Sequence, residues 1–200
     1  NRNSSSLVLE LLEERALLTA GVVDLSFGNN LGRQTTDFSP VTGTADAITA
    51  MARQEDGKIL AAGVAGNFSD GAIARYNADG TIDSTFGSDG FVRIVRFESG
   101  GIKDITLGAL NGGVQSIYVT GTANNGNNDI GVMKITPDGS IDTTFGSNGL
   151  AFANFPQNTT AEAIAIQTVN NVELIVAAGH TQIAGNNSDF AVARFNASTG

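Results

Sequence analysis

The residues with the clearest chemical potential are oxygen-bearing side chains grouped around a glycine turn. In the stretch NADGTID, residues 77–83, one amide and two carboxylates surround Gly80, and calcium loops use a glycine in this way for a sharp turn. The stretch TPDGSID, residues 136–142, keeps two carboxylates around Gly139. The sequence therefore offers five candidate calcium ligands, namely Asn77, Asp79, Asp83, Asp138 and Asp142.

The differences between the copies favour a structural role for these turns. Thr136 stands where the first copy has Asn77, and the third copy, NASTG at 196–200, lacks the carboxylate. No glutamate follows at the distance that an EF-hand requires. The sequence therefore predicts Asx-type turns, in which Asp79 or Asp138 accepts hydrogen bonds from nearby backbone and the glycine is left-handed. Calcium remains the alternative, and no other cofactor is expected.

A second acidic position recurs three residues before a phenylalanine, at Asp24, Asp83 and Asp142. These carboxylates could be metal ligands or bases. A catalytic group is normally built once, however, whereas these carboxylates recur each time the phenylalanine does. We expect them to accept hydrogen bonds from loop amides or to pair with a basic residue of a strand, because a half-buried charge needs a partner. The basic residues at the matching positions are Arg75, Lys134 and Arg194.

The sequence shows no recognisable catalytic machinery. Its one histidine, His180, is matched by Val64 and Thr122 in the other repeats, and a histidine base needs a nucleophile and an orienting carboxylate. No motif of a serine hydrolase, a P-loop protein or a zinc hydrolase is present. We therefore assign no catalytic residue and expect a non-enzymatic protein.

A repeated element positions these residues. Glycine-rich loops surround Phe27, Phe86 and Phe145, which follow one another at intervals of 59 residues. Such self-similarity is the signature of a repeat architecture. We place the three repeats at approximately 22–80, 81–139 and 140–200, after an N-terminal segment at 1–21. Each phenylalanine is expected to tuck into the apolar seam between adjacent repeats.

Each repeat contains four strand-like segments. The first alternates polar and apolar residues, and the second is almost continuously apolar, as expected of a strand covered on both faces. The first three segments lie at 47–52, 58–65 and 70–77, then at 104–109, 116–123 and 129–136, and then at 163–167, 174–181 and 189–196. The fourth follows the phenylalanine loop, at 31–38, 90–97 and 149–155.

Four short strands in a period of about 59 residues predict an all-β fold, a β-propeller-like array of four-stranded antiparallel blades. A two-sheet sandwich is the alternative. Propellers usually close with about 4 to 8 blades, so three repeats leave apolar faces and strand edges open. We therefore expect the chain to belong to a longer array, or to pair with a second copy to complete a ring.

Composition limits the partners. A net charge of −9 argues against nucleic acid and against an anionic membrane surface, because both require clustered basic residues. The absence of cysteine excludes disulfides. The stretch LVLELLEERALL at 7–18 predicts a short N-terminal helix that is too short and too charged to span a bilayer.

The motifs also resemble a known family. The stretch QEDGKILAAG at 54–63, followed by DGAIARYNADGTIDSTFGSDG at 70–90, is similar to the delta-60 repeat of large bacterial proteins, many of them secreted or surface-associated. The copies at 111–121 and 169–179 match less closely, and the resemblance covers residues 22–200. The N-terminal stretch 9–21 resembles the segment that precedes the mature region of many planctomycete-type surface proteins. These resemblances imply a propeller-like fold and an extracellular setting, and they bring no catalytic residue or ligand.

The favoured function is a structural or interaction scaffold in a secreted or cell-surface bacterial protein. Loops on a rigid frame usually carry recognition, so we expect a protein or glycan to bind where loops break the repeat, at 64–70, 122–129 and 180–189. The alternatives are a calcium-stabilised adhesion module and a part of a glycan-active enzyme.

Overall fold

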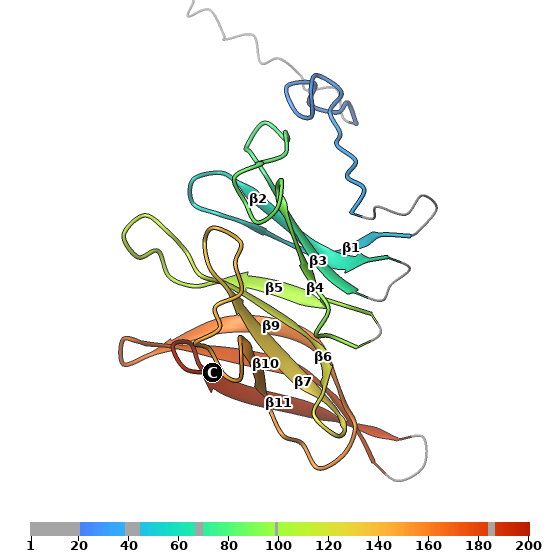
Figure 1. Ribbon diagram of the computed structural model, residues 1–200, viewed down its shortest axis with the longest axis vertical. Helices are drawn as coiled ribbons and strands as arrows, with labels where there is room; N and C mark the ends of the chain where they lie inside the picture. Colours follow the sequence, from blue (N-terminus) through green and yellow to red (C-terminus); the bar gives the residue numbers. More distant parts are fainter. Residues whose placement is uncertain (1–20, 39–44, 67–69, 99, 184–186) are drawn as a thin grey trace, which may run out of the picture.

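The computed structural model describes residues 21–38, 45–66, 70–98, 100–183 and 187–200, in which eleven strands form three antiparallel sheets and no helix occurs. The sheets are stacked one on the next along the long axis of the molecule (Figure 1). The all-β, propeller-like class predicted from the sequence is confirmed, and the sheets do not close into a ring. The helix predicted at 7–18 lies outside the described residues.

The first two sheets each contain four strands in chain order. The first sheet is β1 (Ala47–Arg53), β2 (Ile59–Ala65), β3 (Asp70–Tyr76) and β4 (Phe91–Ile94). The second is β5 (Asp104–Leu107), β6 (Ile117–Asn124), β7 (Asn128–Ile135) and β8 (Leu150–Phe152). In both sheets the last strand comes from beyond the phenylalanine loop, so the sheets cross the sequence boundaries placed at 80–81 and 139–140.

The third sheet has three strands, in the order β11-β10-β9. They are β9 (Thr159–Val169), β10 (Val172–Gln182) and β11 (Ser188–Asn196). Within the described residues β11 has β10 on one side and no strand on the other. The third sheet therefore ends in a free edge where the first two sheets carry β4 and β8.

The strand segments predicted from the sequence appear in the structure with one exception. Residues 31–38, predicted as the fourth strand of a repeat, form no strand. The reason is a missing neighbour, since β4 and β8 each pair with the third strand of their own sheet. No third strand precedes residues 31–38 within the part of the chain that the structure describes.

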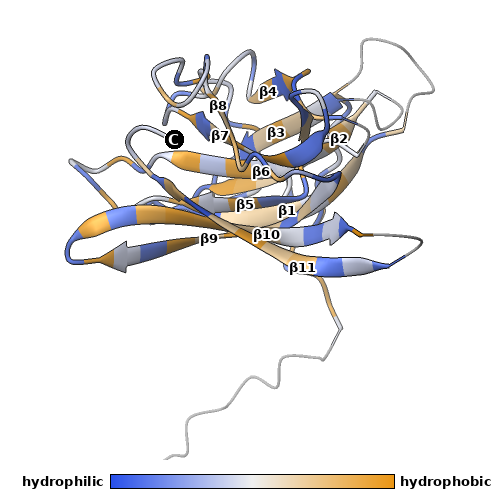
Figure 2. Ribbon diagram, turned by 90° about the horizontal axis from the view of Figure 1, so that it is seen from below, coloured by the Kyte–Doolittle hydropathy of each residue, from blue (hydrophilic) through white to orange (hydrophobic). Residues whose placement is uncertain are grey.

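Strands β6, β7 and β8 of the second sheet each contribute to two cores, because successive side chains point to opposite faces of a sheet. In β7, Met133 packs in a cluster with residues of the first sheet such as Ile73, whereas Val132 packs with residues of the third sheet such as Ile175. All four side chains are fully buried. Apolar residues accordingly run along much of the strand length (Figure 2). Burial on both faces explains the almost continuously apolar sequence of β6.

Candidate functional site

The phenylalanine loops hold neighbouring sheets together. The side chains of Phe86 and Phe145 are fully buried in the clusters between the first and second and between the second and third sheets, respectively. The loop amide of Gly87 donates to the carbonyl of Asp138 at 2.7 Å. Gly139 allows this close contact, because its φ is +92° and a Cβ at this position would lie 2.5 Å from the Gly87 nitrogen. The expected seam position of the phenylalanines is confirmed for these two residues.

The repeated aspartates organise these loops and carry ion pairs. One oxygen of Asp83 accepts hydrogen bonds from the backbone NH (3.1 Å) and hydroxyl (2.6 Å) of Thr85, and the other lies 2.7 Å from Arg75 Nε and 2.9 Å from Lys58 Nζ. Asp142 binds Thr144 in the same way and lies 3.1 Å from Lys134 Nζ. The predicted pairing is thus confirmed for two of the three copies.

The pKa of Asp83 reflects these contacts. Burial acts to raise it, but the hydrogen bonds from Thr85 and Lys58 and the charge of Arg75 outweigh burial and hold the pKa well below its ordinary value. For Asp142, the hydrogen bond from Thr144 is the main cause of a lowered pKa. Both carboxylates are therefore anionic at neutral pH, as partners of a cation should be.

The candidate calcium ligands form two kinds of contact. Asp79 accepts hydrogen bonds from the NH and hydroxyl of Thr81 at 2.9 and 2.7 Å, which lower its pKa, and Asp138 is bound in the same way by Thr136 and Ser140. Asn77 donates from Nδ2 to the Thr81 hydroxyl at 3.1 Å. The predicted Asx-type turns are confirmed. Asp79 and Asp138 thus accept hydrogen bonds within their own turns, whereas Asp83 and Asp142 also form ion pairs with lysine or arginine. The described residues contain no group of three or more acidic or histidine side chains suited to a metal.

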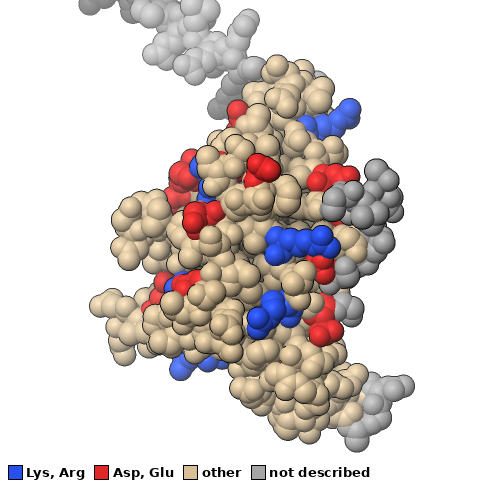
Figure 3. Space-filling view, in the orientation of Figure 1, with Lys and Arg blue, Asp and Glu red and all other residues tan. Residues whose placement is uncertain are grey.

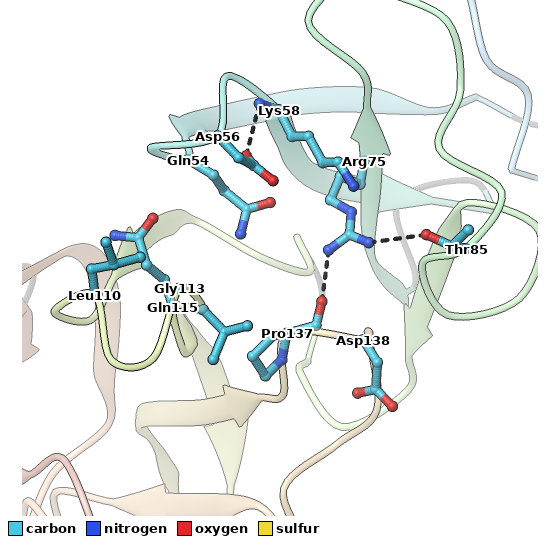
Figure 4. Close-up of a pocket in the computed structure, with 11 residues that line it drawn as sticks. Gln54, Asp56, Lys58, Arg75, Thr85, Leu110, Gly113, Gln115, Pro137 and Asp138 are labelled. Atoms are coloured by element: carbon cyan, nitrogen blue, oxygen red, sulfur yellow. Dashed lines mark hydrogen bonds between the residues drawn. The ribbon is translucent and has the colours of Figure 1, made fainter.

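A cleft of about 350 Å³ opens where the first two sheets meet, between the β1–β2 hairpin and the β5–β6 connection (Figure 4). Gln54, Asp56 and Lys58 line it from the hairpin, and Leu110 and Gln115 line it from the connection. Arg75, which forms one wall, donates to the carbonyl of Pro137 at 2.6 Å and lies 4.5 Å above the Phe86 ring. The cleft therefore sits directly against the charged contacts that join the two sheets.

Gln54 is the residue of the cleft with an unmet hydrogen-bonding need. Its side chain points into the cleft (Figure 4) and is 5% exposed, yet its Oε1 atom is buried without a partner. Nearby Gln115 is satisfied, because its Oε1 accepts from the backbone NH of Glu55 at 3.2 Å and its Nε2 donates to the carbonyl of Gly108 at 3.0 Å. A buried acceptor without a partner costs about 1–3 kcal/mol. This arrangement suits a ligand that brings a hydrogen-bond donor.

A second cleft, of about 520 Å³, occupies the matching place between the second and third sheets. Lys134 and Tyr118 line it from the second sheet, and Glu173 lines it from the third. Tyr118 donates to the carbonyl of Ala197 at 2.9 Å, and burial, together with the charge of Glu173, raises the pKa of Tyr118 to about 12. The clefts thus repeat with the sheets, while their side chains differ.

The loops predicted to bind a partner leave a separate groove of about 480 Å³. Asn127, from the 122–129 loop, lines it together with Asn158, Gln182 and Ile183. Asn158 ties the loops together by accepting from the NH of Asn128 at 3.1 Å. Parts of the loops at 64–70 and 180–189 lie outside the described residues.

Gln54 and Gln115 are the site residues that the sequence analysis missed. Neither stands out in the sequence, because the hairpins that carry them differ in length between repeats and offer no matching position to compare. His180, in contrast, lies 3.7 Å from Glu162 on the third sheet, and no serine or cysteine nucleophile accompanies the pair among its described contacts.

Comparison with known proteins supports this architecture. The matching family is described as "Domain of unknown function (DUF5122) beta-propeller", and it matches residues 54–86, 116–145 and 175–198. These segments are thus similar to β-propeller repeats. Each matched segment covers the second and third strands of one sheet, and the first two segments end at Phe86 and Phe145. The β-propeller match therefore has the same repeat period as the structure. No curated protein matches the chain.

The surface shows no large basic region on the face seen in Figure 3, where acidic and basic side chains are interspersed. Among the described residues no helix has the length and apolar character needed to cross a membrane.

Proposed function

We propose that the chain is a non-enzymatic β-propeller-type repeat module that acts as an interaction scaffold in a secreted or cell-surface bacterial protein. Its stacked sheets form the rigid frame, and further repeats or a second copy complete the ring. The resemblance to delta-60 repeats supports the secreted or surface setting.

The partner of the scaffold binds in the cleft between the first two sheets. The observation that supports this role is Gln54, which lines the cleft and whose buried Oε1 has no hydrogen-bond donor. A glycan fits this need, because sugar hydroxyls supply donors and also accept from the neighbouring Lys58. A neutral glycan is favoured over an anionic one, because the chain carries a net charge of −9.

Titration calorimetry with a panel of neutral oligosaccharides tests the proposal. We expect one class of oligosaccharide to bind, and Gln54→Leu to weaken it about tenfold or more, since a site built for a hydrogen bond loses about 1.5 kcal/mol or more without it. Gln157→Leu, in the groove between the loops, is the matched control and should leave binding unchanged.

Two results would argue against the cleft. If Gln157→Leu abolishes binding while Gln54→Leu does not, the loops carry recognition instead. If no neutral oligosaccharide binds at millimolar concentration, the glycan assignment is wrong.

A further inference from the structure

The outer face of the third sheet carries large apolar side chains that no described residue covers. Phe190 is 98% exposed and Val192 is 62% exposed. The matching residues of the second sheet, Ile130 and Val132, are fully buried against the third sheet. The face that carries Phe190 is thus the one on which a following sheet packs elsewhere in the molecule, and it adjoins the free edge of β11.

Residues 22–38 lie at the opposite end of the stack, in the place that the phenylalanine loop and the last strand of a preceding sheet would take. Gly28 NH donates to the carbonyl of Asp79 at 2.7 Å, as Gly87 NH does to Asp138. The Phe27 ring lies against Gly80, where an added Cβ would be 2.6 Å from it. The first sheet therefore already holds the loop of a preceding sheet, while the strands of that sheet are absent from the described residues.

The hydrogen bond that closes this loop has counterparts in the other repeats, and the loop is one residue longer than those at Phe86 and Phe145. Gly32 NH donates to the carbonyl of Phe27 at 2.8 Å, just as Gly90 NH donates to Phe86 at 2.8 Å. Gly32 therefore corresponds to Gly90, and the residues after it correspond to β4.

The two ends carry complementary unpaired charges. Arg194 corresponds to Arg75 and Lys134, but among the described residues it forms no ion pair and donates only a 3.3 Å hydrogen bond to Gln167. Asp24 corresponds to Asp83 and likewise forms no ion pair there, since its described bonds are those from Ser26. Each end thus presents the charge that the other end lacks.

We propose that a second copy of this chain completes the third sheet. Residues 22–38 of each copy add to the free edge of β11 in the other, which brings Asp24 to Arg194 and covers Phe190 with the first sheet of the other copy. The eleven strands and the added strand make three complete four-stranded sheets per chain. Two chains then form a closed, twofold ring of six, within the usual range of about 4 to 8 blades. This assembly is independent of the ligand role proposed for the cleft.

The register of the added strand follows from the first two sheets. Val92 pairs with Ile73 in the first sheet, and Ala151 pairs with Val132 in the second. Because Gly32 corresponds to Gly90, Gln34 is the counterpart of Val92 and should lie opposite Val192 of the other copy.

Charge reversal tests the pairing of the ends. By light scattering after gel filtration, we expect the chain to have twice its 20.5 kDa mass. Asp24→Lys and Arg194→Glu should each raise the dissociation constant about tenfold or more, because like charges then face each other at both junctions. Arg96→Glu, an exposed change outside the junctions, should leave it unchanged. Mixing the two weakened variants should restore the dimer, because every junction then has one acid and one base.

Failure to restore the dimer on mixing would overturn the proposal, as would a native chain that stays monomeric at high micromolar concentration. Thermal melts of each variant show whether the fold is intact, and an unfolded variant is replaced by the milder Asp24→Asn or Arg194→Gln.

Cysteine cross-linking tests the register, and the natural chain has no cysteine to interfere. Residues directly opposite in a sheet are close enough for a disulfide. We expect the variant with both Gln34→Cys and Val192→Cys to form a covalent dimer on oxidation, and the variant with Gln34→Cys and Ala177→Cys, a buried position on β10, to form none. A cross-link within one chain, or a ladder of higher oligomers, would overturn the closed two-copy ring.

Discussion

Replacing Arg75 with methionine should lower stability substantially, because it breaks a buried ion pair while keeping most of the volume. Arg75 and Asp83 are 9% and 5% exposed in their side chains and lie 2.7 Å apart. Removing one partner of a buried pair costs about 3–5 kcal/mol. Asp83 keeps Lys58 and Thr85, so we expect about 2–4 kcal/mol for Arg75→Met, a range centred at the lower end of that cost.

Chemical and thermal denaturation measure the effect. A loss of about 2–4 kcal/mol corresponds to a fall of about 4–16 °C in Tm for a chain of this length. Lys134→Met is the matched control, because its pair with Asp142 is more exposed, at 16% and 17%, and longer, at 3.1 Å. We expect that control to cost about 1 kcal/mol.

The cause can be separated from the loss of packing by a double-mutant cycle. If the lost pairing with Asp83 is what destabilises Arg75→Met, then Asp83→Asn in that background should cost less than it does alone, with a coupling of about 1 kcal/mol or more. Additive effects, or an Arg75→Met variant as stable as the native protein, would refute the reasoning.

The pH dependence has a definite sign. Because the folded pKa of Asp83 lies below its ordinary value of 3.8, its stabilising contribution is present above that pH and is lost as the pH falls through the folded pKa. The stability deficit of Arg75→Met relative to the native protein should therefore shrink on acidification, because protonation removes the negative charge that Arg75 no longer neutralises.

Three further changes test other contacts. Phe145→Ala should cost about 3–5 kcal/mol in denaturant unfolding, because the ring is fully buried between the second and third sheets. Gly139→Ala should destabilise more than Gly126→Ala: both glycines have positive φ, but a Cβ at Gly139 meets the Gly87 nitrogen at 2.5 Å whereas nothing lies within 4 Å at Gly126, and equal costs would contradict the loop-to-turn contact. A thermal melt with calcium and then with chelator should show no shift, because Asp79 and Asp83 are bound by Thr81, Lys58 and Arg75; a rise of several degrees in calcium would favour the calcium-stabilised alternative.

The fold was largely predictable because its repeats reinforce one another. A single apolar run such as that of β2 is ambiguous between strand and helix, but three copies at a fixed interval around Phe27, Phe86 and Phe145 identify four strands and their order. The pairing of Asp83 with Arg75 was predictable for the same reason. Residues 31–38 were not, because forming a strand depends on a neighbouring edge that sequence alone does not supply.

The cleft was beyond sequence analysis for a different physical reason. Gln54 and Gln115 come from hairpins in different sheets, and only the stacking of those sheets brings them to the same cleft. Their roles differ because only one of the two side-chain carbonyl oxygens has a hydrogen-bond donor. The backbone NH of Glu55 donates to Gln115. In the sequence, each glutamine looks like an ordinary residue of a polar turn.

The contact between Gly87 and Asp138 also has a consequence for biosynthesis. The first sheet receives β4 only after the Phe86 loop, and that loop is anchored by a turn that the ribosome makes almost one whole repeat later. A nascent chain cannot finish one sheet until most of the next has emerged, so folding during translation should lag by one repeat. A deletion that removes one sheet, from its first strand to its last, would separate a phenylalanine loop from the turn that anchors it. The natural unit by which the array gains or loses a repeat is therefore the interval between successive phenylalanine loops rather than the sheet.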